Sequence, residues 1–398
     1  MTQVDAWPAT LPPFLWGTST SAHQVDGEDA TSDWAAAEPS GRVPTAGMAA
    51  DHWRLFREDI ARFRAQNLNA YRFSTEWSRI EPVPDRWDRE AVSHYREMVQ
   101  ACREAGLEPF VTLHHFTLPA WLQDRGGWLH PQAPALFARY VAHMAAHLGD
   151  VKLWCTINEP TMLAVMGYVR GVWPPFRRNP VAALRLIGAL KRAHRAAWAA
   201  IKKAHPSALV GLAHSMLAMR PASSMWADRA AADLTHRLYN LKTVDLLADV
   251  QDFIGLNYYT RAWIRWHHLA DPLMSRGEGP VTDMGWEIDP EGFAELLAIL
   301  GRRYRRPILI TENGIATEDD LLRARYVAAH LAVVKASRQA PRAVPVHGYF
   351  YWSGIDNYEW IEGYRPRFGL YRVDYASQQR TLKAGAEILA QWAGQGPP

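Results

Sequence analysis

Short apolar segments alternate with amphipathic helical segments along this chain, and this alternation constrains the fold more than any other feature. Seven apolar segments rich in β-branched and aromatic residues are predicted strands, spanning 68–74, 108–116, 151–158, 208–214, 252–259, 307–313 and 346–352, and residues 14–24 can supply an eighth. Helical patterns such as 51–66, 89–106 and 319–339 lie between them. Strands that alternate with helices form right-handed βαβ units, so a parallel sheet is expected.

Eight such units can close into a (β/α)8 TIM barrel, an α/β fold whose active site lies at the C-terminal ends of the strands. A doubly wound open sheet is the alternative, but the first strand is not followed by a glycine-rich phosphate loop. No Gly/Ser-rich, charged or low-complexity linker divides the chain. We therefore expect residues 1–398 to form a single barrel domain.

Composition narrows the class of partner. The 44 Lys and Arg residues against 41 Asp and Glu give a formal charge of +3, which is too balanced and dispersed for a nucleic-acid-binding surface. Two cysteines, Cys102 and Cys155, are too few for a disulfide framework and lack metal-site spacing. Neither a leader-like N-terminus nor an apolar stretch of membrane-spanning length is visible, so a cytoplasmic protein without membrane partners is expected.

Two predicted strands end in glutamates, which are costly to bury unless they are paired or used. Glu159 follows the fourth strand in "TINEP", and Glu312 follows the seventh in "PILITENG". Loops on opposite sides of a barrel mouth can bring two such carboxylates face to face. A pair about 5–5.5 Å apart suits a retaining glycosidase, and a wider pair suits an inverting one. The structural alternative is a pair of salt-bridged glutamates.

Eight motifs in order resemble glycoside hydrolase family 1, the β-glucosidase family, over nearly the whole chain. They are "FLWGTSTSAHQVDG" (14–27), "YRFSTEWSRI" (71–80), "VTLHHFTLP" (111–119), "GGWL" (126–129), "TINEP" (156–160), "GLNYYT" (255–260), "ITENG" (310–314) and a C-terminal block from "GYFYWSG" to "YRVDY" (348–375). The resemblance implies a retaining exo-β-glycosidase that needs neither a cofactor nor a metal.

The resemblance also implies roles for individual residues. Glu312 would be the nucleophile and Glu159 the acid/base, while Arg72 and Tyr259 would contact the nucleophile and Asn257 would support both glutamates. Those two glutamates need opposite protonation states at rest, and hence different surroundings. The substrate-binding residues would be Gln24, His115, Asn158, Trp352, Glu359 and Trp360, with Trp352 as the platform under the sugar ring. A sugar requires such polar groups in its plane and an aromatic ring on its apolar face.

Two further side chains in these motifs invite other interpretations. The paired His114 and His115 suggest a metal, but adjacent strand residues point to opposite faces and cannot share one ion. We expect His115 to face the sugar and His114 to lie in the core. Glu76 lies on the same strand face as Arg72 by alternation, and could add an ion pair near the barrel mouth.

The expected substrate is a small-molecule β-glycoside or oligosaccharide with a terminal β-D-glucose, and galactose and fucose stay open as alternatives. Glu359 is acidic and would repel a 6-phosphate, so the sugar is expected to be unphosphorylated. Three other functions compete with this hypothesis: a transglycosylase that uses the same residues, an endoglycanase of a related barrel family, and a catalytically silent carbohydrate-binding barrel. The sequence does not determine the oligomeric state.

Overall fold

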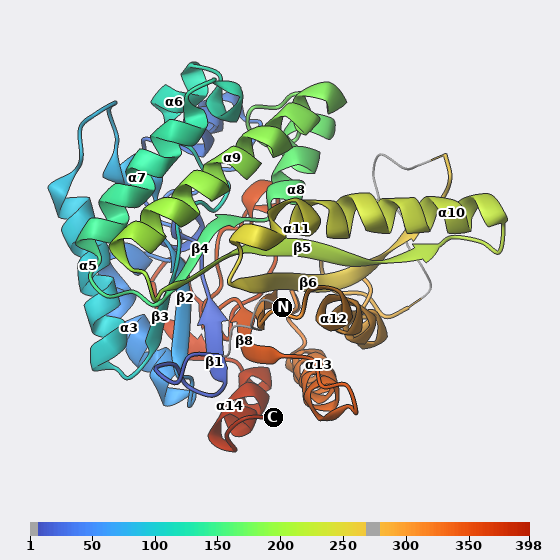
Figure 1. The fold of residues 1–398 in the computed structure, drawn as a ribbon. Helices are drawn as coiled ribbons and strands as arrows, with labels where there is room; N and C mark the ends of the chain where they lie inside the picture. The colour runs from blue at the N-terminus through green and yellow to red at the C-terminus, as the bar shows by residue number, and fades with distance from the viewer. Residues whose placement is uncertain (1–6, 268–278) are drawn as a thin grey trace.

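In this computed structural model, which describes residues 7–267 and 279–398, eight parallel strands close into a barrel (Figure 1). The strands are β1 (Leu15–Ser19), β2 (Ala70–Ser74), β3 (Glu108–Thr112), β4 (Leu153–Asn158), β5 (Leu209–Pro221), β6 (Phe253–Ile264), β7 (Ile308–Asn313) and β8 (Val346–Trp352). The barrel closes because β1 pairs with both β2 and β8. The predicted TIM barrel is confirmed.

Helices surround the barrel and follow the predicted alternation (Figure 1). The long ones are α3 (His52–Ala65), α5 (Arg89–Glu104), α7 (Ala133–His147), α9 (Pro180–Ala204), α10 (Trp226–Thr235), α12 (Pro290–Tyr304) and α13 (Asp320–Gln339). Short ones are α1 (Ala22–Val25), α2 (Asp33–Ala37), α4 (Trp77–Ile80), α6 (Ala120–Asp124), α8 (Pro160–Ala164), α11 (Lys242–Leu247) and α14 (Glu387–Gly394), and β9 (Tyr371–Val373) pairs with β10 (Arg380–Leu382) outside the barrel.

Local side-chain chemistry sets where several helices begin. Asp88, Asn179, Asp289 and Asp319 each precede a helix and accept hydrogen bonds from its first backbone N–H groups. Such caps satisfy donors that otherwise lack a partner at a helix start. Short polar residues therefore give these four helices defined starts on the outside of the barrel.

The lower part of the barrel interior is filled by side chains and forms a solid floor. Phe110, Phe253 and Phe350 meet there edge to face, with ring centroids 5.6 Å apart for Phe110 and Phe253 and 5.4 Å apart for Phe110 and Phe350. Leu15, Leu153 and Leu309 belong to the same inner cluster. Because the floor is packed, a ligand can enter only from the other end, where the strands terminate.

Several strand ends differ from those expected, and β1 stops at Ser19 rather than at residue 24. The third strand ends at Thr112 rather than at residue 116, because pairing with β4 stops there and Phe116 has a left-handed φ of 76°. Strands β5 and β6 run on to Pro221 and Ile264, well beyond the barrel rim (Figure 1). They stay paired over that extension, from Ala218 with Arg261 onward, so the mutual ladder sustains them outside the barrel.

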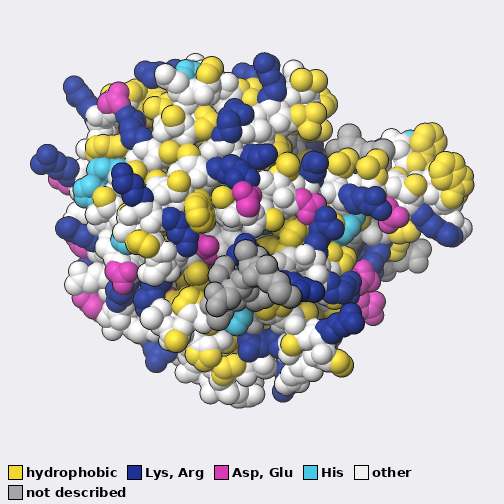
Figure 2. Space-filling model, in the orientation of Figure 1, with side chains coloured by type: hydrophobic (Ala, Val, Ile, Leu, Met, Phe, Trp, Pro, Cys, Tyr) yellow, Lys and Arg dark blue, Asp and Glu magenta, His cyan; other side chains and the backbone are white. Residues whose placement is uncertain are grey.

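The distribution of surface charge and the state of the two cysteines agree with what the composition predicts. On the face shown in Figure 2, Lys and Arg side chains are spread among Asp and Glu and do not form one basic stripe. Cys102 and Cys155 are free and buried. Within residues 7–267 and 279–398, no helix is both long and apolar enough to cross a membrane. The cytoplasmic location stays a prediction, and part of the N-terminal segment on which it depends, residues 1–6, lies outside the described residues.

Gly314, directly after the strand that carries Glu312, makes a close backbone contact that tolerates no side chain. A Cβ atom there would lie 2.8 Å from the carbonyl carbon of Trp352 and closer still to its oxygen. We expect Gly314→Ala to destabilise the protein by about 1–3 kcal/mol, because neither backbone can give way cheaply. The measurement is the Tm.

Gly188→Ala is the matched control, because the nearest atom to its added Cβ is Arg192 Nη1 at 3.7 Å. Gly188 lies within helix α9, where alanine is favoured over glycine by about 1 kcal/mol, so the Tm should hold or rise. A Gly314→Ala variant as stable as the parent would contradict the close contact.

Candidate active site

A chain of hydrogen bonds joins the two strand-end glutamates across the barrel mouth. Arg72 donates to Glu312 Oε1 over 2.5 Å and to Asn158 Oδ1 over 2.7 Å. Asn257 Nδ2 donates to the same Asn158 oxygen over 3.2 Å and to Glu159 Oε1 over 2.8 Å. Asn158 therefore connects the partner of one carboxylate to the partner of the other.

Glu312 is the penultimate residue of strand β7 and receives hydrogen bonds on both of its carboxylate oxygens. Tyr259, from β6, donates to Oε2 over 2.7 Å, while Arg72 contacts Oε1. The guanidinium of Arg72 is fully buried in β2, and Thr112 Oγ1 and the Thr311 carbonyl accept its remaining hydrogen bonds. Both partners predicted for Glu312 are therefore in contact with it, and its carboxylate is held in a fixed orientation.

Glu159 has a different environment. It follows β4 directly with a left-handed φ of 44° and precedes Pro160, the first residue of helix α8. Burial and the negative charge of Glu312 raise the pKa of Glu159 to about 8, against the opposing effects of Asn257 and Arg72. At neutral pH this side chain therefore holds a proton that it can donate.

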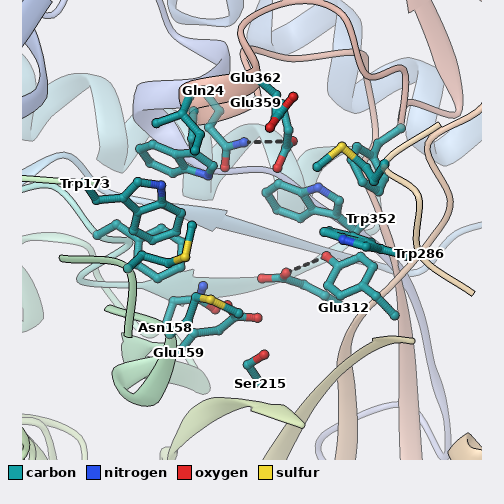
Figure 3. Close-up of a pocket in the computed structure, with 18 of the residues that line it drawn as sticks. Gln24, Asn158, Glu159, Trp173, Ser215, Trp286, Glu312, Trp352, Glu359 and Glu362 are labelled. Carbon is teal, nitrogen blue, oxygen red and sulfur yellow. Dashed lines mark hydrogen bonds between the residues drawn. The ribbon is translucent and has the colours of Figure 1, made fainter. Parts of the chain in front are cut away.

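The two glutamates line one pocket, with a cavity volume of about 270 Å³ (Figure 3). All six predicted substrate-binding residues line it: Gln24, His115, Asn158, Trp352, Glu359 and Trp360. Tyr259 lines it as well, whereas Arg72 and Asn257 are absent from the lining and lie behind Glu312 and Glu159, which they contact. The strand ends thus bring all eleven predicted residues together.

One end of the pocket is rich in polar groups. Gln24 Nε2 donates to the Tyr358 carbonyl over 3.0 Å and to Glu359 Oε2 over 3.3 Å. Burial, with the charges of Glu312 and Glu159, raises the pKa of Glu359 to about 8. Gln24 Oε1 and His115 Nδ1 are buried without a hydrogen-bond partner within the described part of the chain. Hydroxyl groups of a ligand would satisfy such atoms.

Aromatic rings form the walls of this polar end. The ring of His115 stacks on Trp352, with centroids 5.7 Å apart and planes 18° apart. Trp360 has a left-handed φ of 53° and packs against Trp34, with centroids 4.6 Å apart. In Figure 3 the indole of Trp352 lies beside Glu312. Flat rings beside two carboxylates are suited to binding the apolar face of a sugar ring.

The neighbouring histidines separate as expected, although for a different reason. His114 and His115 lie beyond Thr112, the last residue of β3, so strand alternation does not apply to them. His115 lines the pocket, while His114 Nε2 accepts a hydrogen bond from the buried Trp128 indole over 3.2 Å. The two rings therefore face different surroundings.

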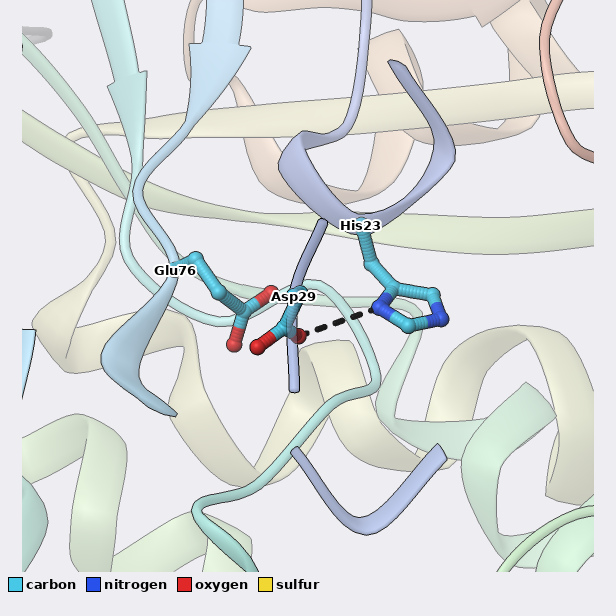
Figure 4. A group of neighbouring side chains, drawn as sticks. All are labelled: His23, Asp29 and Glu76. Carbon is cyan, nitrogen blue, oxygen red and sulfur yellow. Dashed lines mark hydrogen bonds and ion pairs between the residues drawn. The ribbon is translucent and has the colours of Figure 1, made fainter. Parts of the chain in front are cut away.

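The expectation for Glu76 is wrong. Strand β2 ends at Ser74, so alternation no longer places Glu76 on the face of Arg72. Glu76 instead accepts a hydrogen bond from the Ser78 N–H at the start of α4, and another from Thr117 Oγ1 over 2.8 Å. It belongs to a buried group whose other members, His23 and Asp29, are hydrogen-bonded over 3.2 Å (Figure 4).

This group has metal-type side chains, since one ligand atom from each of His23, Asp29 and Glu76 lies within 4.8 Å of the others. Ser78 Oγ donates to carboxylate oxygens of both acids, at 2.8 Å to Glu76. The second ring nitrogen of His23 points away from both acids in Figure 4. The two acids are thus satisfied by His23 and by hydroxyl groups, whereas the outward-facing His23 Nε2 is buried without a hydrogen-bond partner in the described part of the chain. Because that nitrogen faces away from both carboxylates, we assign no metal to the group.

Sequence reasoning missed the outer part of the pocket. Its lining includes Met162, Met166, Trp173, Ser215, Met284, Trp286 and Phe368. One of these could have been found, because Met162 lies three residues after Glu159, one turn along the helix that a proline after "NE" starts. Ser215 could also have been found, because it lies in β5 directly after the predicted strand 208–214. Met166 lies in the π-helical turn after α8, and the remaining residues come from loops whose paths the strand pattern does not predict.

A parallel barrel whose mouth holds two glutamates among amides and indoles is the architecture of a glycoside hydrolase. The chain belongs to glycosyl hydrolase family 1, whose sequence model matches residues 8–244 and 239–394. Beta-glucosidase A of Thermotoga maritima is 32% identical over 93% of this chain and 94% of its own length. The enzyme therefore acts on O-glycosidic bonds.

Solved structures agree with this assignment. The beta-glycosidase from Pyrococcus horikoshii superposes with a TM-score of 0.90 at 37% identity, covering 97% of this chain and 94% of that one. The beta-glucosidase from Thermotoga maritima in complex with glucoimidazole has a TM-score of 0.90 at 30% identity, covering 98% of this chain and 99% of that one. The family expected from the eight motifs is confirmed.

The Glu76 group predicts a pH-dependent stability. Burial and the charge of Asp29 raise the pKa of Glu76 from 4.5 to about 7. Its folded-state pKa lies above the unfolded value, so ionisation destabilises the fold progressively from about pH 4.5 to about pH 7 and fully above that. Glu76→Gln removes this effect, so the Tm gained over the parent should be larger at pH 8 than at pH 5.

Glu58→Gln, which replaces an exposed glutamate of α3, is the control and should change the Tm equally at both pH values. A Glu76→Gln variant with the same Tm difference at pH 5 and pH 8 would show that Glu76 does not titrate in this range.

Proposed function

We propose that this enzyme is a retaining exo-β-glycosidase that removes terminal β-D-glucose from β-glucosides by double displacement. The observation that carries the proposal is the difference between the two glutamates at the barrel mouth. Glu312 receives hydrogen bonds from Arg72 and Tyr259 on its two oxygens. The pKa of Glu159, in contrast, is raised to about 8, so this side chain holds a proton at neutral pH. One is arranged as a nucleophile and the other as an acid.

In the first step, a carboxylate oxygen of Glu312 attacks the anomeric carbon of the sugar. The bond from that carbon to the leaving oxygen breaks as the new ester bond forms, and Glu159 transfers its proton to the leaving oxygen. The leaving group departs as a neutral alcohol. Arg72 and Tyr259 hold the attacking carboxylate in place before the bond forms.

In the second step, Glu159 acts as a base. Esterification of Glu312 removes a negative charge, and that charge is one of the causes that raise the pKa of Glu159. The pKa of Glu159 therefore falls in the covalent intermediate, and its carboxylate can take a proton from water. The water oxygen attacks the anomeric carbon as this proton passes to Glu159, the ester bond to Glu312 breaks, and the sugar leaves with its original configuration.

The polar end of the pocket supports the choice of sugar and the exo mode. Gln24, His115 and Asn158 are buried, and with Glu359 and Trp360 they would close around one terminal sugar. Glu359 supplies no cation that could pair with a phosphate, which favours an unphosphorylated sugar. Glucose is the first candidate, and galactose and fucose follow, because these sugars differ only in a few hydroxyl positions. The proposal treats residues 1–398 as one barrel domain that acts without a cofactor or metal.

Transglycosylation is the second candidate function, since it uses the same residues and differs only in whether an alcohol or water enters the second step. The pair Glu159 and Glu312, with Arg72 in contact, disfavours a silent binding barrel, because sugar binding alone requires no buried proton donor.

The first test is initial rates on nitrophenyl β-glucoside, β-galactoside, β-fucoside, β-mannoside and 6-phospho-β-glucoside. We expect an unphosphorylated substrate to be hydrolysed, and Glu312→Ala to lose at least about 10³-fold in kcat. Proton NMR of the products should show the β-anomer first. An α-anomer first would contradict retention, and a folded protein that hydrolyses none of the panel would favour the binding barrel.

The pKa of Glu159 predicts the alkaline limit of activity. Its proton is needed in the first step, so kcat/KM on an alkyl β-glycoside should fall as the pH rises through about 8. A dinitrophenyl glycoside, whose leaving group needs no proton, is the control and should keep its kcat/KM across that range. Identical alkaline limits for the two substrates would mean that another group is titrating.

A further inference from the structure

The pocket changes character from its deep end to its outer end. Gln24, His115 and Asn158 at the deep end are polar and at most 4% exposed. The outer lining, on the side to which a leaving group must extend from Glu159, is mostly apolar. It includes Met162, Met166, Met284, Trp286 and Ile361.

Two methionines follow Glu159 along the chain. Met162 lies in helix α8, which begins directly after Glu159, and Met166 lies in the π-helical turn η3 (Val165–Val169) that continues it. Glu159 must reach the leaving oxygen, so a leaving group bonded to that oxygen lies beside this segment. The first wall that it meets is therefore built from thioether side chains.

The facing wall comes from the segment between β6 and α12. Met284 and Trp286 pack against the cluster of Trp352 and Phe368, and the ring of Trp286 lies 5.5 Å from that of Tyr259. In Figure 3, Trp286 lies beside Trp352 and on the side of the cavity away from Trp173. Apolar groups thus line both sides of the space beyond the catalytic pair.

Three polar side chains of this outer region, Thr260, Glu362 and Arg170, have partners within the protein, and Arg170 donates to Met166 Sδ over 3.8 Å. Thr260 Oγ1 donates to the Glu287 carbonyl over 2.9 Å, and Glu362 accepts from Arg365 over 2.6 Å. Ser215 Oγ points into the cavity near Glu159 in Figure 3. A second sugar would bring several hydroxyl groups here, and those that do not reach Ser215 would lose water without a matching partner.

We propose that the leaving group of the natural substrate is an apolar alcohol, alkyl or aryl, rather than a second sugar. The inference rests on the proposed function and deepens it by naming the class of aglycone. Thioether side chains are flexible and polarizable, so Met162, Met166 and Met284 can adjust to apolar groups of different shapes. The site accordingly accepts a range of apolar alcohols.

The test is kcat/KM on methyl, butyl, hexyl and octyl β-glycosides of the preferred sugar, below micelle-forming concentrations, with cellobiose alongside. These alcohols leave with similar chemistry, so chain length changes mainly the apolar surface that is buried. We expect kcat/KM to rise about two- to fourfold per methylene until the outer pocket is filled. Cellobiose should fall below the butyl glycoside.

Two variants test the walls directly. Met162→Gln and Met284→Gln keep the side-chain length and replace the thioether by an amide, so each should flatten the rise with chain length. Met225→Gln is the matched control, because Met225 is 55% exposed and absent from the pocket lining, and the rise should be unchanged.

The two proposals fail in different ways. A flat response to chain length, or cellobiose hydrolysed better than octyl glycoside, would overturn the apolar aglycone while the enzyme still hydrolyses nitrophenyl glycosides. If the folded protein, checked by its cooperative thermal unfolding, hydrolyses no nitrophenyl glycoside, the glycosidase function itself would be overturned.

Discussion

The buried ion pair between Arg72 and Glu312 is the interaction on which the site depends. A guanidinium at the centre of a barrel mouth is costly to desolvate and needs every donor satisfied. Here Glu312, Asn158, Thr112 and the Thr311 carbonyl accept its hydrogen bonds, so residues from β2, β3, β4 and β7 are fixed by one side chain. Because Asn158 also accepts from Asn257, the same set of contacts orients Glu159, and the two carboxylates are positioned relative to each other by a shared network.

The barrel makes this network possible through its register. In the parallel pairing of β6 with β7, Asn257 lies opposite Glu312, and in that of β5 with β6 it lies opposite Ser215. Side chains at the ends of strands far apart in sequence therefore meet at one height above the packed phenylalanine floor. The register shifts in β5, β6 and β7 fall next to these same residues, so the regular ladder stops where the side chains take up their functional positions.

The strand pattern of the sequence predicted side-chain positions within the strands, but it failed for residues beyond the strand ends. Glu159 and Glu312 were found because a carboxylate at the end of an apolar strand contradicts the pattern around it. Glu76 was misplaced because alternation was carried past Ser74, where β2 ends and helix α4 is about to begin. The apolar walls at Met284 and Trp286 were missed, since a loop leaves no periodicity by which a side chain's direction can be inferred. The motifs predicted residues that line the deep end of the pocket, whereas its outer side could be described only from the structure.

Charge explains why the deep and outer ends of the pocket differ. Glu159, Glu312 and Glu359 share one cavity, and the charge of Glu312 contributes to the raised pKa of the other two. Of the three, the buried cation Arg72 contacts only Glu312. Burial therefore leaves Glu159 and Glu359 protonated near neutral pH, and both can donate as well as accept hydrogen bonds. A sugar hydroxyl requires this dual capacity, because it is itself both donor and acceptor. The same exclusion of water that raises these pKa values requires apolar walls around the opening, and Met162, Met284 and Trp286 provide them. The proposed acid and the apolar surface that would bind the leaving group are thus two consequences of one desolvated site.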